Sequence, residues 1–227
     1  KVMEDTVALL RSVFRTENQL TLPISGTGSA GVEASFDNFL EPDDVAVIGV
    51  NGVFGERMAE NASRCGARVV KVPADWGRIV EPEAIEAALQ AEKKVKLVAL
   101  VHAETSTGAL QPLGDVSRLA KEHDALLLVD TVTSLAGQEV AVDDWGIDIC
   151  YSGTQKCLSA PPGLSPVSFS PRAVEVIRGR KTKVQSWYLD MNMVGRYWGS
   201  DRVYHHTAPI SAVFALREAL RLILEEG

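Results

Sequence analysis

Short apolar runs alternate with helical patterns along most of this chain, and this alternation constrains the fold more than any other feature of the sequence. The runs VAVIGV (45–50), LVALVH (97–102) and ALLLVD (125–130) are short and almost wholly aliphatic, as in strands that are buried on both faces. Helical patterns fill the intervals, for example at 82–91, which has a proline at its start. The sequence therefore predicts an α/β fold, with a mostly parallel sheet covered by helices on both faces.

The remaining elements continue this alternation. Further strands are expected at 67–72, 147–151 and 166–169. Helices are expected at the N-terminus, in the segment after residue 29, and at 55–65, 116–122, 172–178 and 210–225.

Composition and charge argue against several classes of function. The 227 residues include 23 Lys and Arg against 30 Asp and Glu, and this net charge of -7 is unlike that of a nucleic-acid binder. The apolar runs are far shorter than the roughly 20 residues of a membrane span, so no membrane partner is expected. The N-terminus lacks the layout of a secretory signal, and the three cysteines have neither CxxC nor zinc-ligand spacing. We therefore expect a reducing compartment: the cytoplasm, or a peroxisome or mitochondrion in a eukaryote.

Two residues that could take part in catalysis, a carboxylate and a lysine, lie at the ends of predicted strands, where parallel sheets bind ligands. Asp130 ends one strand, and Lys156 follows another within the loop SGTQK (152–156). The amine of a lysine that is held away from bulk water is nucleophilic toward aldehydes. From these two residues alone, an Asp130–Lys156 ion pair or an exposed lysine in a turn remains the simpler alternative.

The segment SGTGS (25–29) feeds an amphipathic helix, which is typical of an anion site because free backbone N–H groups converge there. A capped, flexible turn is the alternative, since the spacing matches neither a Walker loop nor GxGxxG. Together, an amine, a carboxylate, an anion loop and an apolar ring face match what pyridoxal phosphate needs. Phe54 could supply the ring face, although a core aromatic role is equally open.

Seven segments, in this order, then carry a resemblance to a known family. They are SGTGSAGVEAS (25–35), NGVFGER (51–57), HAETSTGALQPL (102–113), LLLVDTVTSLAG (126–137), GIDICYSGTQKCLSAPPG (146–163), GRKTK (179–183) and YHHTAPI (204–210). In these segments the chain resembles the class V, fold-type I aminotransferases that use pyridoxal 5'-phosphate. Within that family it is most similar to the enzymes that pair alanine or serine with glyoxylate or pyruvate.

The resemblance implies that residues 1–227 are the cofactor-binding large domain of the family, built on a seven-stranded sheet. The resemblance also leads us to expect that the family's N-terminal arm and smaller C-terminal domain are absent from this chain. The family's arginine for the substrate carboxylate belongs to that smaller domain, and no residue here matches it.

The resemblance also implies residue roles around the cofactor. Lys156 matches the Schiff-base lysine and catalytic base, and Asp130 matches the carboxylate at the ring nitrogen. Phe54 matches the aromatic residue on one ring face and Val132 the residue on the other. Thr105 matches the hydroxyl near the phenolic oxygen.

The phosphate ligands are implied in the same way. In this chain they are Thr27, Gly28, Ser29 and Gln155, joined by Tyr204 and Thr207, which the family supplies from the neighbouring subunit. A homodimer with shared active sites follows from the last two residues. No metal site is expected, because His205 and His206 have no third ligand at metal-like spacing.

The implied activity is transamination between a small amino acid and a small 2-oxo acid. Alternatives with the same fold are aminoethylphosphonate transaminase, phosphoserine transaminase and cysteine desulfurase. The desulfurase needs a mobile nucleophilic cysteine, and Cys65, Cys150 and Cys157 lie in no evident flexible loop. A non-catalytic binding module is the remaining alternative.

Overall fold

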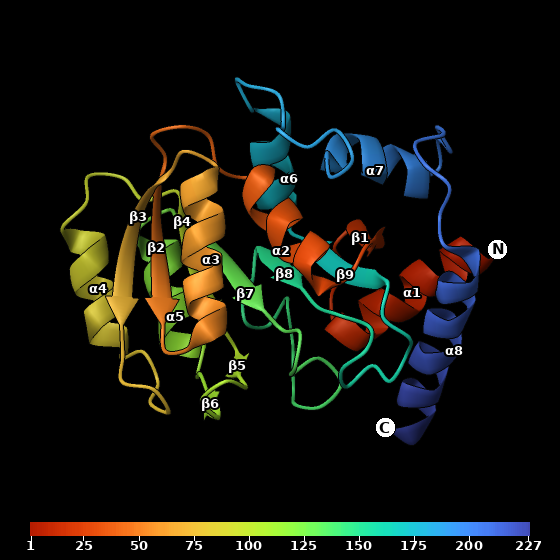
Figure 1. Cartoon of the computed structure of the whole chain (residues 1–227), viewed down its shortest axis with the longest axis horizontal. Helices are drawn as coiled ribbons and strands as arrows, with labels where there is room; N and C mark the ends of the chain where they lie inside the picture. Colours follow the sequence, from red (N-terminus) through yellow and green to blue (C-terminus); the bar gives the residue numbers. More distant parts are fainter.

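Seven strands form one sheet in the computed structural model, which describes residues 1–227 (Figure 1). Their spatial order is β1-β9-β8-β7-β4-β2-β3. The strands are β1 (Leu20–Ser25), β2 (Val45–Val50), β3 (Arg68–Pro73), β4 (Leu97–Val101), β7 (Leu126–Asp130), β8 (Ile149–Tyr151) and β9 (Leu164–Phe169). A separate hairpin joins β5 (Ala103–Glu104) to β6 (Ala109–Leu110).

The sheet is parallel except at β9, which pairs antiparallel with both β1 and β8. The expected α/β class with a mostly parallel sheet is therefore confirmed. The pairing of β7 with β8 sets Asp130 directly beside Tyr151. Because β2, β4, β7 and β8 run in the same direction, the residues that follow them meet at one edge of the sheet.

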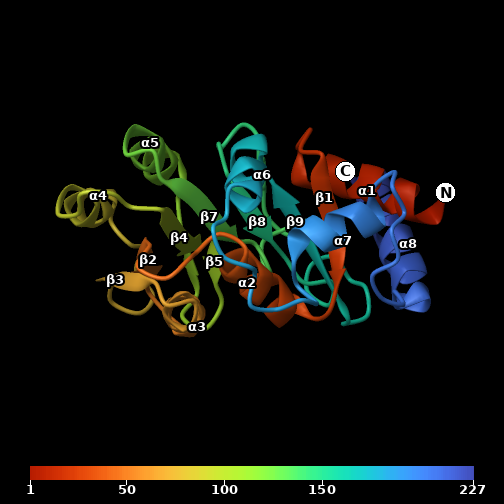
Figure 2. The ribbon, with the colours of Figure 1, turned by 90° about the horizontal axis from the view of Figure 1, so that it is seen from above.

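Helices cover both faces of the sheet (Figure 2). On one face lie α2 (Gly28–Asp37) and α3 (Val53–Arg64). On the other lie α4 (Pro82–Gln90), α5 (Gly114–Glu122) and α6 (Pro171–Arg178). No helix combines the length and the apolar character that a membrane crossing requires.

Three further helices lie around the β1 end of the sheet. Helix α1 (Val2–Phe14) packs along α8 (Ile210–Glu226), and α7 (Met191–Trp198) contacts β1 and α6 (Figure 1). The N-terminal helix and the helix at 210–225 were predicted, whereas α7 was not.

Strand β1 was also missed, and proline explains why. Pro23 interrupts the run LTLPIS and cannot donate to a ladder, which argues against a central strand. In the structure β1 is an edge strand, and Pro23 faces Pro166 of β9 in register. Proline is tolerated at such an edge.

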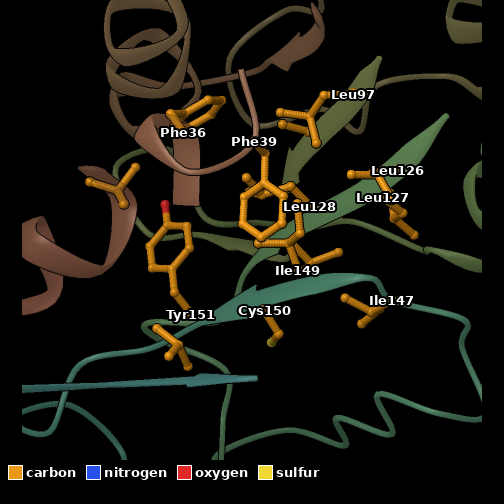
Figure 3. Packing of buried hydrophobic residues seen from close by; sticks show 14 of the residues in the cluster. Phe36, Phe39, Leu97, Leu126, Leu127, Leu128, Ile147, Ile149, Cys150 and Tyr151 are labelled. Atoms are coloured by element: carbon orange, nitrogen blue, oxygen red, sulfur yellow. The ribbon is translucent and has the colours of Figure 1, made fainter. Parts of the chain in front are cut away.

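The core lies between the sheet and its helices. Figure 3 shows Phe36 and Phe39, from the α2 region, beside the aliphatic residues of β7 and β8. Phe39 packs edge-to-face on Phe169 of β9, with ring centroids 5.2 Å apart. This packing fixes α2 on the sheet, and with it the loop that precedes the helix.

Candidate active site

A cavity of about 180 Å³ opens at the carboxyl edge of the sheet, where the loops after β1, β2, β4, β7 and β8 converge. Both polar and apolar groups line it. Its lining residues are Thr27, Gly28, Ser29, Val32, Phe54, Arg57, Val101, Ala103, Asp130, Val132, Thr133, Tyr151, Gln155 and Lys156.

The loop before α2 presents a helix N-terminus to this cavity. Thr27 is the N-cap residue, and its side chain makes no capping hydrogen bond. The first-turn N–H groups of a helix have no intrahelical acceptor, so those of Gly28 and Ser29 are free to bind an anion. The amide of Gly26 donates to the Gly163 carbonyl at 2.9 Å, which ties the loop to the segment before β9.

Gly28 lies where two neighbouring loops approach the start of α2. A Cβ there would lie 3.6 Å from Val132 Cγ2 and 3.8 Å from the Cα of Gly153. The helix start, the loop after β7 and the loop after β8 are therefore within van der Waals reach of one another. A group bound between them would contact all three.

Asp130 is buried at the end of β7, and both of its oxygens accept hydrogen bonds. The Val132 amide donates to Oδ1 at 2.8 Å, and the Tyr151 hydroxyl donates to Oδ2 at 2.6 Å. Burial raises the pKa of Asp130 to about 6, and these two donors oppose the rise. Nearby Glu104 raises this pKa further, and Arg57 lowers it. A cation that entered the cavity would lower the pKa of Asp130 and favour its ionised form.

Lys156 is exposed in the loop after β8, where its carbonyl accepts from the Ser159 amide at 2.9 Å, but its side-chain amine makes no hydrogen bond or ion pair. The Asp130–Lys156 ion pair that the sequence left open does not form, and the Asp130 carboxylate accepts from the Tyr151 hydroxyl and the Val132 amide. The amine therefore remains free to react with a ligand in the cavity.

Hydrogen bonds between the strand-end loops hold the site in shape. The Thr133 hydroxyl donates to the Ala103 carbonyl at 2.7 Å, and the Ser152 hydroxyl donates to the Thr131 carbonyl at 3.1 Å. The Thr131 amide and hydroxyl both donate to the Tyr151 carbonyl, each at 2.9 Å. These bonds link the segments after β4, β7 and β8, so their side chains are held in fixed relative positions.

Glu104 fixes the start of α3, which carries Phe54. Its fully buried carboxylate accepts from the amides of Phe54 at 3.0 Å and Gly55 at 3.2 Å, the usual arrangement at a helix N-terminus. Gly52 is required beside it, because a Cβ at that position would lie 2.4 Å from Glu104 Cδ. The Arg57 guanidinium lies over the Phe54 ring, 4.9 Å from its centroid.

The structure brings most of the sequence-predicted site residues together and separates three from them. Eight line the cavity: Thr27, Gly28, Ser29, Phe54, Asp130, Val132, Gln155 and Lys156. Thr105 lies instead in the exposed turn between β5 and β6, outside the cavity lining.

Tyr204 and Thr207 line a second, mainly apolar cavity of about 310 Å³ beside α8. Tyr204 is 76% exposed, and its hydroxyl lies 3.3 Å from Thr207 Oγ1. Within one chain, these two residues do not reach the cavity that holds Lys156.

Several lining residues were not predicted from the sequence, although two of them had a recognisable signal there. Arg57 follows Phe54 by three helical positions, which places both side chains on one face of α3. Tyr151 ends a strand next to the one that Asp130 ends, so a parallel register would set the two residues side by side. Ala103 and Thr133 carry no comparable signal.

Comparison with known proteins gives consistent matches over the whole chain. A family model described as aminotransferase class-V matches residues 1–227. Alanine–glyoxylate aminotransferase of Oryctolagus cuniculus is 44% identical over 230 residues, which cover 100% of this chain and 58% of the relative. The (S)-ureidoglycine–glyoxylate transaminase of Bacillus subtilis is 38% identical and also covers 100% of this chain and 58% of its own length.

A solved structure agrees with these matches. The crystal structure of alanine–glyoxylate aminotransferase from Nostoc sp. superposes with a TM-score of 0.97 at 53% identity, over 100% of this chain and 60% of that one. The chain thus spans somewhat more than half the length of the relatives it matches. With the family model covering every residue, the chain belongs to the class V aminotransferases, which depend on pyridoxal phosphate.

Proposed function

We propose that this chain is the cofactor-binding large domain of an enzyme that transfers an amino group from a small amino acid to glyoxylate or pyruvate. The observation that carries the proposal is one cavity that joins a free lysine amine, a buried carboxylate and a helix N-terminus. The relatives named above support glyoxylate as acceptor, with alanine or ureidoglycine as donor.

The chemistry of the cavity fits pyridoxal phosphate group by group. Lys156 offers an amine for an aldehyde, and the first turn of α2 offers N–H groups for a phosphate. Asp130 offers a buried carboxylate without a full cationic partner, which suits a protonated ring nitrogen. Phe54 and Val132 offer apolar faces for a flat ring.

Within this site each residue would have a definite task. Bound pyridoxal phosphate supplies an electron sink for bonds at the substrate α-carbon. Lys156 Nζ would take the proton from that carbon and hold it for return. Asp130 would keep a proton on the ring nitrogen through a charge-assisted hydrogen bond. Phe54 and Val132 would orient the ring and exclude water from its faces.

A homodimer with shared sites is part of this proposal. Tyr204 and Thr207 lie outside the cavity of their own chain, which is consistent with a role in a partner's site. Large apolar side chains near them are exposed, including Ile210 at 64% and Phe214 at 53%. Such a patch beside α8 is typical of a surface that another chain covers.

The desulfurase alternative finds no support in the cysteines. Cys65 and Cys150 are buried, and burial raises the pKa of each thiol to about 12, far from that of a nucleophilic thiolate. Cys157 is exposed, but its thiol donates to the Thr133 carbonyl at 3.4 Å, within the tied loops.

A matrix of amino donors and 2-oxo acids tests the proposal. The complete protein, loaded with pyridoxal phosphate, is assayed with alanine, serine and ureidoglycine against glyoxylate and pyruvate. Turnover of at least one pair, abolished in Lys156→Ala, is the expected result. Cofactor binding without turnover of any pair would contradict the proposed reaction and favour another class V activity.

A further inference from the structure

Tyr151 is buried and held in a fixed position by hydrogen bonds to Thr131 and by the packing of α2. It ends β8, is only 2% exposed, and its carbonyl accepts from both the amide and the hydroxyl of Thr131. Helix α2 lies over it, because Gly31 allows a close approach: a Cβ there would lie 3.4 Å from Tyr151 Cβ and 2.0 Å from Ser165 Oγ. Figure 3 shows the ring extending away from the strand, with its hydroxyl oxygen at the far end.

That hydroxyl has a single polar partner in the structure, Asp130 Oδ2, at 2.6 Å. Burial is the main cause that raises the pKa of Tyr151 well above its ordinary value, so the phenol stays protonated and can only donate to the carboxylate. An ionised carboxylate offers about four acceptor sites, and Tyr151 and Val132 take two of them. Acceptor sites therefore remain for a donor in the cavity that Asp130 lines.

We propose that Tyr151 is a positioning residue that acts through Asp130, keeping the carboxylate ionised and oriented so that a bound pyridine ring stays protonated. This inference rests on the proposed function and deepens it. The reason is a competition for one proton, which resides either on the ring nitrogen or on the carboxylate. A hydrogen bond donated to the carboxylate makes it a weaker base and leaves the proton on the ring.

Removing the Tyr151 hydroxyl shifts the shared proton from the ring nitrogen toward Asp130. Without the Tyr151 donor, Asp130 becomes more basic and withdraws the proton from the ring nitrogen. The electron sink then weakens, although the apolar contacts of the aromatic ring at position 151 are unchanged. The loss should therefore appear in kcat rather than in KM.

The test is Tyr151→Phe in the complete protein, loaded with pyridoxal phosphate that carries ¹⁵N at the ring nitrogen. The nitrogen chemical shift separates a protonated from a neutral ring, independently of turnover. We expect the shift to move toward the neutral form and kcat to fall about tenfold, the order of magnitude that the loss of one hydrogen bond to a charged group typically causes, with KM nearly unchanged.

Thr21→Val is the matched control, since it also removes a buried hydroxyl that makes hydrogen bonds, but in β1 and outside the cavity. It should lower stability without moving the nitrogen shift. A Tyr151→Phe protein with the wild-type shift and kcat would overturn the inference while leaving the proposed function standing. A wild-type protein that binds no pyridoxal phosphate would instead refute the proposed function.

Discussion

His206 Nε2 and Ser25 Oγ lie 2.6 Å apart, although 181 positions separate them in the sequence. The contact ties the segment after α7 to the last residue of β1, directly before the loop that leads into α2. His205 extends it, because its Nδ1 lies 2.7 Å from His206 Nδ1 and its Nε2 lies 3.3 Å from the Trp187 carbonyl. A carbonyl only accepts, so His205 Nε2 carries a hydrogen, and in the neutral pair His206 Nδ1 donates to His205 Nδ1. Ser25 then donates to His206 Nε2.

Breaking this chain of hydrogen bonds should loosen the start of α2. We expect His206→Phe to lower the unfolding free energy by about 2 kcal/mol, the usual net contribution of two hydrogen bonds, or about 4–8 °C in Tm. Thermal unfolding followed by circular dichroism measures this. His123→Ala is the control, because the His123 side chain makes no hydrogen bond at the end of α5. Equal losses in both variants would show that the contact contributes nothing.

Asp130→Asn should preserve the fold and strongly reduce kcat. The amide has nearly the size of the carboxylate, but it cannot hold a pyridinium proton through a charge-assisted hydrogen bond. We expect kcat to fall by roughly a hundredfold or more, as when other preorganised electrostatic contacts are removed. Steady-state kinetics on the cofactor-loaded protein measures the effect, and near-normal turnover would mean that Asp130 has only a structural role.

The stability difference between wild type and Asp130→Asn should depend on pH in the cofactor-free protein. Burial raises the pKa of Asp130 from 3.8 to about 6, so the folded state binds its proton more tightly than the unfolded state. The ionised Asp130 carboxylate therefore destabilises the folded state. This loss of stability is complete above about pH 6 and disappears as the pH falls toward 4. Urea unfolding should therefore show wild type gaining stability relative to Asp130→Asn between pH 7 and pH 4.5. A pH-independent difference would contradict a raised pKa.

The sequence predicted the alternating core elements because buried parallel strands are aliphatic on both faces, as at 97–102 and 125–130. It missed β1 and α7, whose positions depend on the edge of the sheet and on neighbouring helices rather than on their own pattern. It identified Asp130 and Lys156 because Asp130 ends a strand and Lys156 follows one. Tyr151 was not predicted as a site residue, because its contact with Asp130 depends on the register of β7 with β8, which the sequence of one strand does not reveal.

The shared-site proposal predicts a dimer that depends on the apolar surface beside α8. Phe214 is 53% exposed there and lines the cavity with Tyr204 and Thr207. Phe214→Glu should lower the mass toward that of a monomer and weaken cofactor binding, since a charge cannot be buried unpaired. Light scattering over a dilution series measures the mass, with Gln90→Glu, on exposed α4, as the charge-adding control. A cofactor-loaded monomer would rule out shared sites.

The lysine that binds the cofactor covalently can be identified by chemical trapping. Lys156 lines the cavity with Asp130 and the start of α2, and its amine has no competing partner. The complete protein is incubated with pyridoxal phosphate, reduced with borohydride, digested and mapped by mass spectrometry. We expect the reduced cofactor on Lys156 alone, and no labelled peptide in Lys156→Ala. Attachment to another lysine, or no attachment at all, would rule out Lys156 as the residue that binds the cofactor.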